Sequence, residues 1–146
     1  MKVVVMQGVS GSGKSTLSNK LFPYAKHFSA DHYFMIGDEY KFDSSKLGDA
    51  HAECLLKFTN ALMNGGNEDV LVVDNTNTSL WEMAPYIQLA AAMGAEVEVI
   101  RCICRTDVAA DRNTHGVSLK ACAAMQGRME KPLSFWKCSY REVFTG

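Results

Sequence analysis

The segment from Gly8 to Ser15 constrains this chain more than any other part of the sequence. It reads Gly-Val-Ser-Gly-Ser-Gly-Lys-Ser and matches the pattern G-x-x-x-x-G-K-[ST] in full. The apolar run Val3-Val4-Val5-Met6 precedes it, and a predicted helix over about 14–22 follows it. Glycines let the backbone wrap around a phosphate group, so that the N–H groups and the helix N-terminus face the negative charge. A strand, this loop and a helix in that order predict a phosphate-binding loop.

Each residue of the loop has an expected role in binding a nucleoside triphosphate. Lys14 is expected to reach the β- and γ-phosphates, and Ser15 to ligate Mg²⁺. Thr16 is expected to place a hydroxyl group near the α-phosphate. The remaining backbone around the phosphates is expected to come from Gly8, Ser10, Gly11, Ser12 and Gly13. We therefore predict that the chain binds ATP, or another nucleoside triphosphate, together with Mg²⁺.

The rest of the chain alternates between predicted strands and helices, which indicates an α/β fold with a mainly parallel sheet. Strands are predicted at 3–6, 27–30, 70–73 and 96–104. Helices are predicted at 14–22, 46–63 and 80–93, with two or more short helices after Asp107. Pro85 lies inside the 80–93 helix, so an irregular or separate first turn is expected there. Residues 37–45 have the composition of a loop, and the segment 130–146 gives only a weak signal.

Length and composition limit the possible classes of protein. The 146 residues fit one compact domain over 1–146, and 47% apolar with 21% charged residues is typical of a globular protein. No apolar run reaches the roughly 20 residues that cross a bilayer, and the N-terminal apolar run is too short for a signal peptide. We expect a cytoplasmic protein with no membrane association and no obligate protein partner. The net charge of −1 is unlike that of a dedicated duplex-DNA binder, although a local basic patch could still grip a nucleic-acid end.

The cysteines also favour the prediction of a cytoplasmic protein. Their number is odd and no close Cys-x-x-Cys pair occurs, so they make a poor disulfide or zinc framework. Two of them lie two residues apart in a predicted strand and should share one face of it. Buried free thiols are favoured over metal ligands for all five: Cys54, Cys102, Cys104, Cys122 and Cys138.

Aspartates follow two of the predicted strands, at the edge where ligands of open α/β sheets collect. Asp74 comes after four apolar residues and has the form of a Walker B acid that lies near Mg²⁺ or its waters. Asp31 could stand beside an acceptor hydroxyl group and serve as its base. Either aspartate could instead cap a helix or a turn. Asn75, Thr76 and Asn77 could orient a substrate or cap the next helix.

Arginines gather after the predicted strand at 96–104. Arg101, Arg105 and Arg112 are followed by His115-Gly116, which has the form of a helix end running into a hinge. Phosphoryl transfer needs positive charge over the migrating group, and mobile lids often supply it. We predict a short helical lid over about 105–120 that carries Arg112. A solvated arginine face and a structural role for His115 are the alternatives.

Together these motifs resemble the P-loop kinases of the polynucleotide 5′-hydroxyl kinase family, of the phage polynucleotide kinase type. The resemblance extends from about Val3 to Met129, and the order and spacing of its parts carry it. These parts are Gly8–Ser15, Ser29–Tyr33, Tyr40–Asp43 with Ala50-His51, Asp74–Asn77, Trp81–Met83 and Arg112–Val117.

The resemblance implies a fold and a set of residue roles. The fold would be the three-layer α/β/α fold of P-loop NTPases, with four or five parallel strands, the phosphate-loop strand beside the Asp74 strand, and a short lid. Asp31, followed by Tyr33, would be the general base, and Arg112 would contact the donor phosphates. The acceptor side would involve Asp31, Tyr33, Asn75, Asn77 and His115.

Two departures from the family pattern lie on the acceptor side. Phe34 stands where the phage enzyme has a phosphate-gripping arginine, and His115 stands where a second lid arginine is common. The predicted function is ATP-dependent transfer of the γ-phosphate to a 5′-hydroxyl DNA or RNA end. A kinase of a nucleoside or another small hydroxyl compound is the first alternative. A nucleotide-binding switch without acceptor chemistry is the second.

Overall fold

Five parallel strands form the central sheet of the protein in a computed structural model that describes residues 1–146. Strand β1 lies in the middle, because the register pairs its Val5 with Val73 on one side and its Met6 with Ile100 on the other. Across the sheet the strands are β2 (Lys26–Phe28), β5 (Val70–Asp74), β1 (Lys2–Gln7), β6 (Glu96–Ile103) and β7 (Ser139–Phe144). The predicted parallel sheet, with the phosphate-loop strand beside the Asp74 strand, is confirmed.

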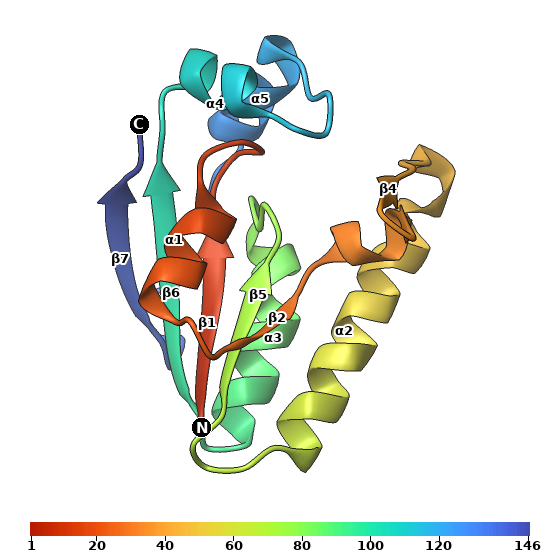
Figure 1. Ribbon diagram of the computed structural model, residues 1–146. Coiled ribbons are helices and arrows are strands. Elements are labelled where there is room, and N and C mark those ends of the chain that lie inside the picture. Colours follow the sequence, from red (N-terminus) through yellow and green to blue (C-terminus); the bar gives the residue numbers. More distant parts are fainter.

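Helices cover both faces of this sheet and make three layers (Figure 1). Helix α1 (Lys14–Leu21) lies on one face, while α2 (Leu47–Asn64) and α3 (Leu80–Ala92) lie on the other. Successive side chains of a strand point to opposite faces. Val4 and Met6 accordingly pack toward α1, whereas Val3 and Val5 pack in the larger core with α2 and α3. Strands buried on both faces explain the continuous apolar runs in the sequence.

Helix α3 is continuous from Leu80 through Pro85, so the irregular first turn expected there is not found. A capping box closes that turn instead. The Ser79 side chain accepts from the backbone of Glu82, and the Glu82 carboxylate accepts from the Ser79 backbone N–H at 3.0 Å. These bonds satisfy donors that a helix start otherwise leaves unpaired.

Several elements were not predicted or have other limits. The strand expected at 27–30 ends at Phe28, and Ala30 already belongs to the 3₁₀ helix η1 (Ala30–Phe34). The segment expected to be a loop contains a small antiparallel hairpin and a 3₁₀ turn. These are β3 (Met35–Ile36), β4 (Glu39–Tyr40) and η2 (Ser44–Lys46). Strand β7 lies in the segment that gave a weak signal. Its side chains are largely exposed, so it lacks the apolar run that marks a buried strand.

Two short helices follow β6, as predicted: α4 (Thr106–Arg112) and α5 (Leu119–Gly127). They sit at the carboxyl ends of the central strands, above the phosphate loop, while the β3–β4 hairpin stands on the other side of the same edge (Figure 1). Four of the five cysteines are buried and Cys138 is half-buried. None of the helices is both long and apolar enough to cross a membrane.

Candidate functional site

The phosphate loop connects β1 to α1 and adopts a conformation that needs its glycines. Gly11 and Gly13 have φ angles of 83° and 92°, in the left-handed region that side chains disfavour. A Cβ atom at Gly11 would also overlap the carbonyl oxygen of Ala109 in α4. The loop therefore adopts a conformation that depends on glycine and packs directly against helix α4.

Lys14 lies inside this loop. Its ammonium group donates to the carbonyl oxygens of Gly8 at 3.1 Å and Val9 at 3.0 Å, and the residue is only 9% exposed. Burial lowers the pKa of Lys14 below its ordinary value, and the charge of Asp74 opposes that effect in part. The Lys14 ammonium group thus lies beside the loop backbone. At this position, phosphate oxygens can replace the two carbonyl oxygens as its hydrogen-bond partners.

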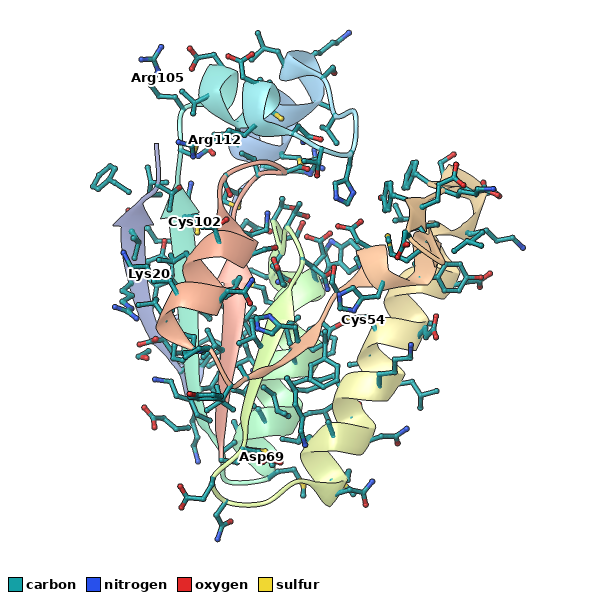
Figure 2. All side chains as sticks on the ribbon, viewed as in Figure 1. Lys20, Cys54, Asp69, Cys102, Arg105 and Arg112 are labelled. Carbon is teal, nitrogen blue, oxygen red and sulfur yellow. The ribbon has the colours of Figure 1, made fainter.

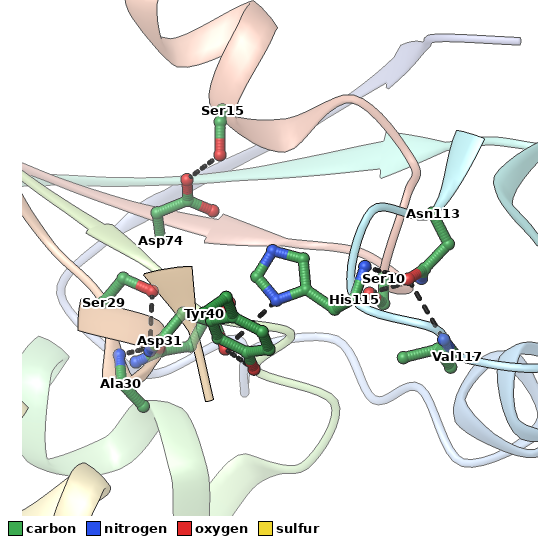
Figure 3. Close-up of polar contacts among 11 residues, drawn as sticks. Ser10, Ser15, Ser29, Ala30, Asp31, Tyr40, Asp74, Asn113, His115 and Val117 are labelled. Atoms are coloured by element: carbon green, nitrogen blue, oxygen red, sulfur yellow. Dashed lines mark hydrogen bonds and ion pairs between the residues drawn. The ribbon is translucent and has the colours of Figure 1, made fainter. Parts of the chain in front are cut away.

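Ser15 and Asp74 meet at the junction of the loop and the sheet. The Ser15 hydroxyl group donates to Asp74 Oδ2, and Asp74 ends β5, the neighbour of β1 (Figure 3). A hydroxyl and a carboxylate oxygen are hard ligands of the kind Mg²⁺ prefers. Protein sites of Mg²⁺ commonly use one or two such ligands and take the others from phosphates and water. The pair therefore fits a magnesium ion bound together with a nucleotide.

Asp31 stands across the cleft from the phosphate loop, at the start of η1. Its own backbone N–H donates to the Ser29 hydroxyl at 3.2 Å, and the Asn75 side chain accepts from the next N–H upstream, that of Ala30, at 2.8 Å. Its carboxylate accepts a 3.0 Å hydrogen bond from the Tyr40 hydroxyl and lies 3.9 Å from His115 Nδ1 (Figure 3). The β5 end and the hairpin therefore fix the position of this carboxylate together.

Asn113, directly after α4, ties the segment predicted to be a lid to the phosphate loop. Its amide group donates to the Ser10 hydroxyl at 2.7 Å, and its oxygen accepts from the backbone N–H groups of His115 and Val117 at 2.8 and 3.1 Å. Arg112 donates to the carbonyl oxygen of Thr145, just after β7, at 2.7 Å. Polar contacts thus connect the phosphate loop, the end of α4 and the end of β7.

These groups surround a cleft of about 830 Å³. Of the predicted site residues, those that line it are Ser10, Gly11, Gly13, Lys14, Ser15, Thr16, Asp31, Asp74, Arg112 and His115. The other lining residues are Leu17, Lys20, Ser29, His32, Met35, Tyr40, Thr76, Thr114 and Thr145. One cavity of ligand size therefore joins the donor-side residues to the proposed acceptor side.

Three residues predicted on the acceptor side do not line the cleft: Tyr33, Asn75 and Asn77. Asn77 is only 2% exposed and donates to the Met6 carbonyl oxygen at 2.7 Å, which ties the ends of β5 and β1 together. Asn75 bonds to the backbone of Ala30, as described above. Tyr33 points into a small separate hollow next to α2. The side-chain amides of Asn75 and Asn77 thus hold the backbone at the edge of the sheet.

Of the predicted loop and lid residues, Gly8, Ser12 and Arg105 also do not line the cleft. The buried Ser12 hydroxyl packs against Gly8 beneath the loop and has no hydrogen-bond partner. Arg105 pairs with Asp107 at 2.7 Å on the exposed side of α4, whereas Arg112 points toward the end of β7 (Figure 2). Of the three clustered arginines, Arg112 alone lines the cleft.

Sequence reasoning gave no role to Tyr40, Thr145 or Lys20. Tyr40 belongs to a motif that carried the family resemblance, but nothing in the spacing shows that its hydroxyl group reaches Asp31. Thr145 reaches the cleft because β7 pairs with β6, as in the register of Val143 with Cys102. Lys20 lies on the exposed side of α1, the helix that follows the loop, and no sequence pattern marks it as a residue of the cleft.

A parallel sheet with this loop, and a cleft at its carboxyl edge, define the P-loop fold. The chain belongs to the AAA domain family AAA_33, whose model matches residues 3–132. Human NEDD4-binding protein 2 is 36% identical over 91 residues. That match covers 60% of this chain but 5% of the human protein, so the chain spans a small part of its relative.

Solved kinase structures share the fold at low sequence identity. A putative kinase from Chloroflexus aurantiacus has a TM-score of 0.68 at 17% identity, over 99% of this chain and 85% of that one. A gluconokinase from Sinorhizobium meliloti has a TM-score of 0.61 at 15% identity, over 97% and 82%. The APS kinase of Mycobacterium tuberculosis, solved with AMPPNP and APS, has 0.57 at 20%, over 98% and 87%. These likenesses confirm the predicted fold class.

Proposed function

We propose that this protein is an ATP-dependent kinase that transfers the γ-phosphate to the 5′-hydroxyl group of a DNA or RNA end. One observation carries the proposal: a fixed carboxylate, Asp31, faces the phosphate loop across a single cleft. A donor site and a base on opposite walls are what phosphoryl transfer to a hydroxyl group requires. We also propose that residues 1–146 act as one kinase domain, with 105–120 as its lid.

The residues divide the chemistry between them. Lys14 exchanges its two loop carbonyl partners for phosphate oxygens, and Arg112 turns from the Thr145 carbonyl toward the migrating group. Ser15 and Asp74 would hold Mg²⁺, which supplies charge neutralisation when it is bound. Asp31 accepts the proton of the acceptor hydroxyl group. The hydroxyl oxygen then bonds to the γ-phosphorus as the bond from that phosphorus to the β,γ-bridging oxygen breaks, and ADP leaves.

The surface beside Asp31 favours a nucleic-acid end as acceptor. Met35, Ile36 and Phe42 of the hairpin region are 44%, 63% and 54% exposed next to the acceptor end of the cleft. An exposed aromatic ring such as that of Phe42 can serve as a platform on which a base stacks, and Met35 and Ile36 extend the apolar surface beside it. Lys20 and His32 line the cleft and offer positive or hydrogen-bonding groups to backbone phosphates.

A small hydroxyl compound is the second candidate, and one contact favours it. The Tyr40 and His115 rings meet with their centroids 4.1 Å apart, which narrows the cleft beside Asp31. A nucleoside or another small acceptor would pass this constriction more easily than a polymer end if the two rings stay in contact. The two candidates differ in which acceptor becomes labelled in a transfer assay.

A labelling assay with γ-labelled ATP tests the proposal. Single-stranded DNA and RNA with 5′-hydroxyl ends, and free nucleosides, are offered to the native protein, Asp31→Asn and Asp38→Asn. Asp38 lies in the exposed hairpin turn outside the cleft, so its variant is the matched control.

We expect label on the 5′ ends and full activity in Asp38→Asn. In Asp31→Asn we expect a loss of at least about a hundredfold, with ATP binding retained. Label on nucleosides alone would establish the second candidate. ATP hydrolysis without any labelled acceptor, or full transfer by Asp31→Asn, would contradict the kinase assignment.

A further inference from the structure

The two oxygens of the Asp31 carboxylate differ in their surroundings. Oδ1 accepts the Tyr40 hydroxyl hydrogen bond at 3.0 Å and is also the oxygen that lies 3.9 Å from His115 Nδ1. Oδ2 has no hydrogen-bond partner in the protein, and the residue lines the cleft. One oxygen is thus held by the protein, and the other is free to meet an acceptor hydroxyl group.

Tyr40 is suited to hold that carboxylate in one orientation. Burial and the neighbouring Asp31 charge raise the pKa of Tyr40 well above its ordinary value, so its hydroxyl group stays a donor throughout the physiological range. Strand pairing with Met35 fixes its backbone, and the Phe34 and Phe42 rings pack around its own ring. The Tyr40 hydroxyl group, which donates the hydrogen bond to Asp31, is therefore on a side chain that its neighbours hold in place.

The same ring is the point where the hairpin meets the lid. His115 packs edge-on against Tyr40, with ring centroids 4.1 Å apart and an interplanar angle of 65°. The His115 backbone is anchored by Asn113, which also bonds to Ser10 in the phosphate loop. A chain of direct contacts thus runs from the donor loop through the lid to the residue that holds Asp31.

We infer that Tyr40 is the positioning residue of the acceptor side. Its hydroxyl group orients Asp31 so that Oδ2 faces the acceptor, and its ring gives the lid loop a surface to close against through His115. The inference rests on the proposed kinase function. Its requirement is geometric, because a base must lie within hydrogen-bond reach of the proton that it removes.

Tyr40→Phe tests this inference because it removes the hydroxyl group and keeps the ring. Tyr140→Phe is a matched control: the Tyr140 hydroxyl donates to the Glu142 carboxylate, also at 3.0 Å, on β7 and outside the cleft. We expect Tyr40→Phe to lower kcat for the labelled acceptor by about tenfold to a hundredfold, the range for a hydrogen bond to a charged group. The KM for ATP and the melting temperature should match those of the control.

A spectroscopic measurement distinguishes a changed environment of the Asp31 carboxylate from a general loss of structure in Tyr40→Phe. With ¹³C-labelled aspartate, the Asp31 carboxyl resonance is assigned by its disappearance in Asp31→Asn. We expect Tyr40→Phe to displace it and Tyr140→Phe to leave it in place. An unmoved resonance, or full kcat in Tyr40→Phe while the native protein labels an acceptor, would overturn the inference alone. A native protein that labels no acceptor would overturn the kinase function, and this inference with it.

Discussion

Gly11 illustrates how much a single residue decides in the phosphate loop. Its φ of 83° belongs to the left-handed region, and its missing side chain lets Ala109 of α4 approach the loop backbone. Gly94 has a similar φ of 78° after α3, but a Cβ there would meet nothing within 4 Å. Both glycines thus have a left-handed backbone conformation, but only Gly11 has another backbone segment packed against it.

We therefore predict different costs for alanine at these two positions. Gly94→Ala should lower the free energy of unfolding by about 1–2 kcal/mol, the cost of a left-handed conformation. Gly11→Ala adds a steric overlap with a backbone atom and should cost about 2–5 kcal/mol in all. It should also weaken ATP binding, because the loop can relieve the overlap only by moving away from α4. Urea unfolding and nucleotide titration measure both effects, and equal costs would contradict the packing argument.

At the level of elements, α2 and α3 are joined to the sheet through aromatic side chains. The Phe58 ring of α2 is fully buried and makes edge contacts with Phe28 of β2 and Tyr86 of α3, at centroid distances of 5.8 and 5.0 Å. The Tyr86 hydroxyl group donates to the Cys54 sulfur at 3.3 Å. One turn of α2, from Cys54 to Phe58, thus packs against both the edge strand β2 and helix α3.

Phe58→Ala should lower the free energy of unfolding by about 3–5 kcal/mol, because it removes buried area and leaves a cavity between three elements. Leu56→Ala, in the same helix but at a side chain that is 61% exposed, should change it by less than about 0.5 kcal/mol. Chemical denaturation of both variants gives the comparison. A small effect of Phe58→Ala would mean that the core collapses to fill the cavity.

The elements themselves were predictable to different degrees. Strand β5 and helix α2 are marked in the sequence by an apolar run and by helical spacing, since each buries a long apolar surface. Strand β7 and the β3–β4 hairpin carry no comparable pattern. They are defined by their pairing partners, as when β7 adds to the edge of β6, and single-sequence patterns do not contain that information.

For the whole molecule, the cleft is built from segments far apart in the chain. Ser15 follows β1, Asp31 follows β2, Asp74 ends β5, Arg112 ends α4 and Thr145 follows β7. A ligand that bridges them must hold these segments together. Binding to the folded state alone then stabilises that state by mass action.

We predict that ATP with Mg²⁺, at about a hundred times its Kd, stabilises the protein by about 2.7 kcal/mol. The melting temperature should then rise by roughly 5 to 10 °C for a chain of this size. Chelation of Mg²⁺ with EDTA should reduce the rise, and Ser15→Ala should remove most of the difference between ATP with and without the metal. The exposed Ser134→Ala is the control. An equal difference in Ser15→Ala would contradict the assignment of Ser15 to Mg²⁺. Thermal melts at fixed nucleotide concentration decide the matter.

The sequence by itself determined the phosphate loop, the central strands and the aspartates at their ends. Each of these is a local pattern, in which the residues that act together are neighbours in the chain or follow one buried strand. The tertiary structure alone decided that Tyr40 holds Asp31, that Asn75 and Asn77 support backbone instead of lining the cleft, and that Thr145 receives Arg112. Those contacts join residues from separate elements, so they exist only once the sheet has aligned the strand ends. The loop motif thus predicted nucleotide binding from the sequence, whereas only the fold placed Asp31 in the same cleft as the loop.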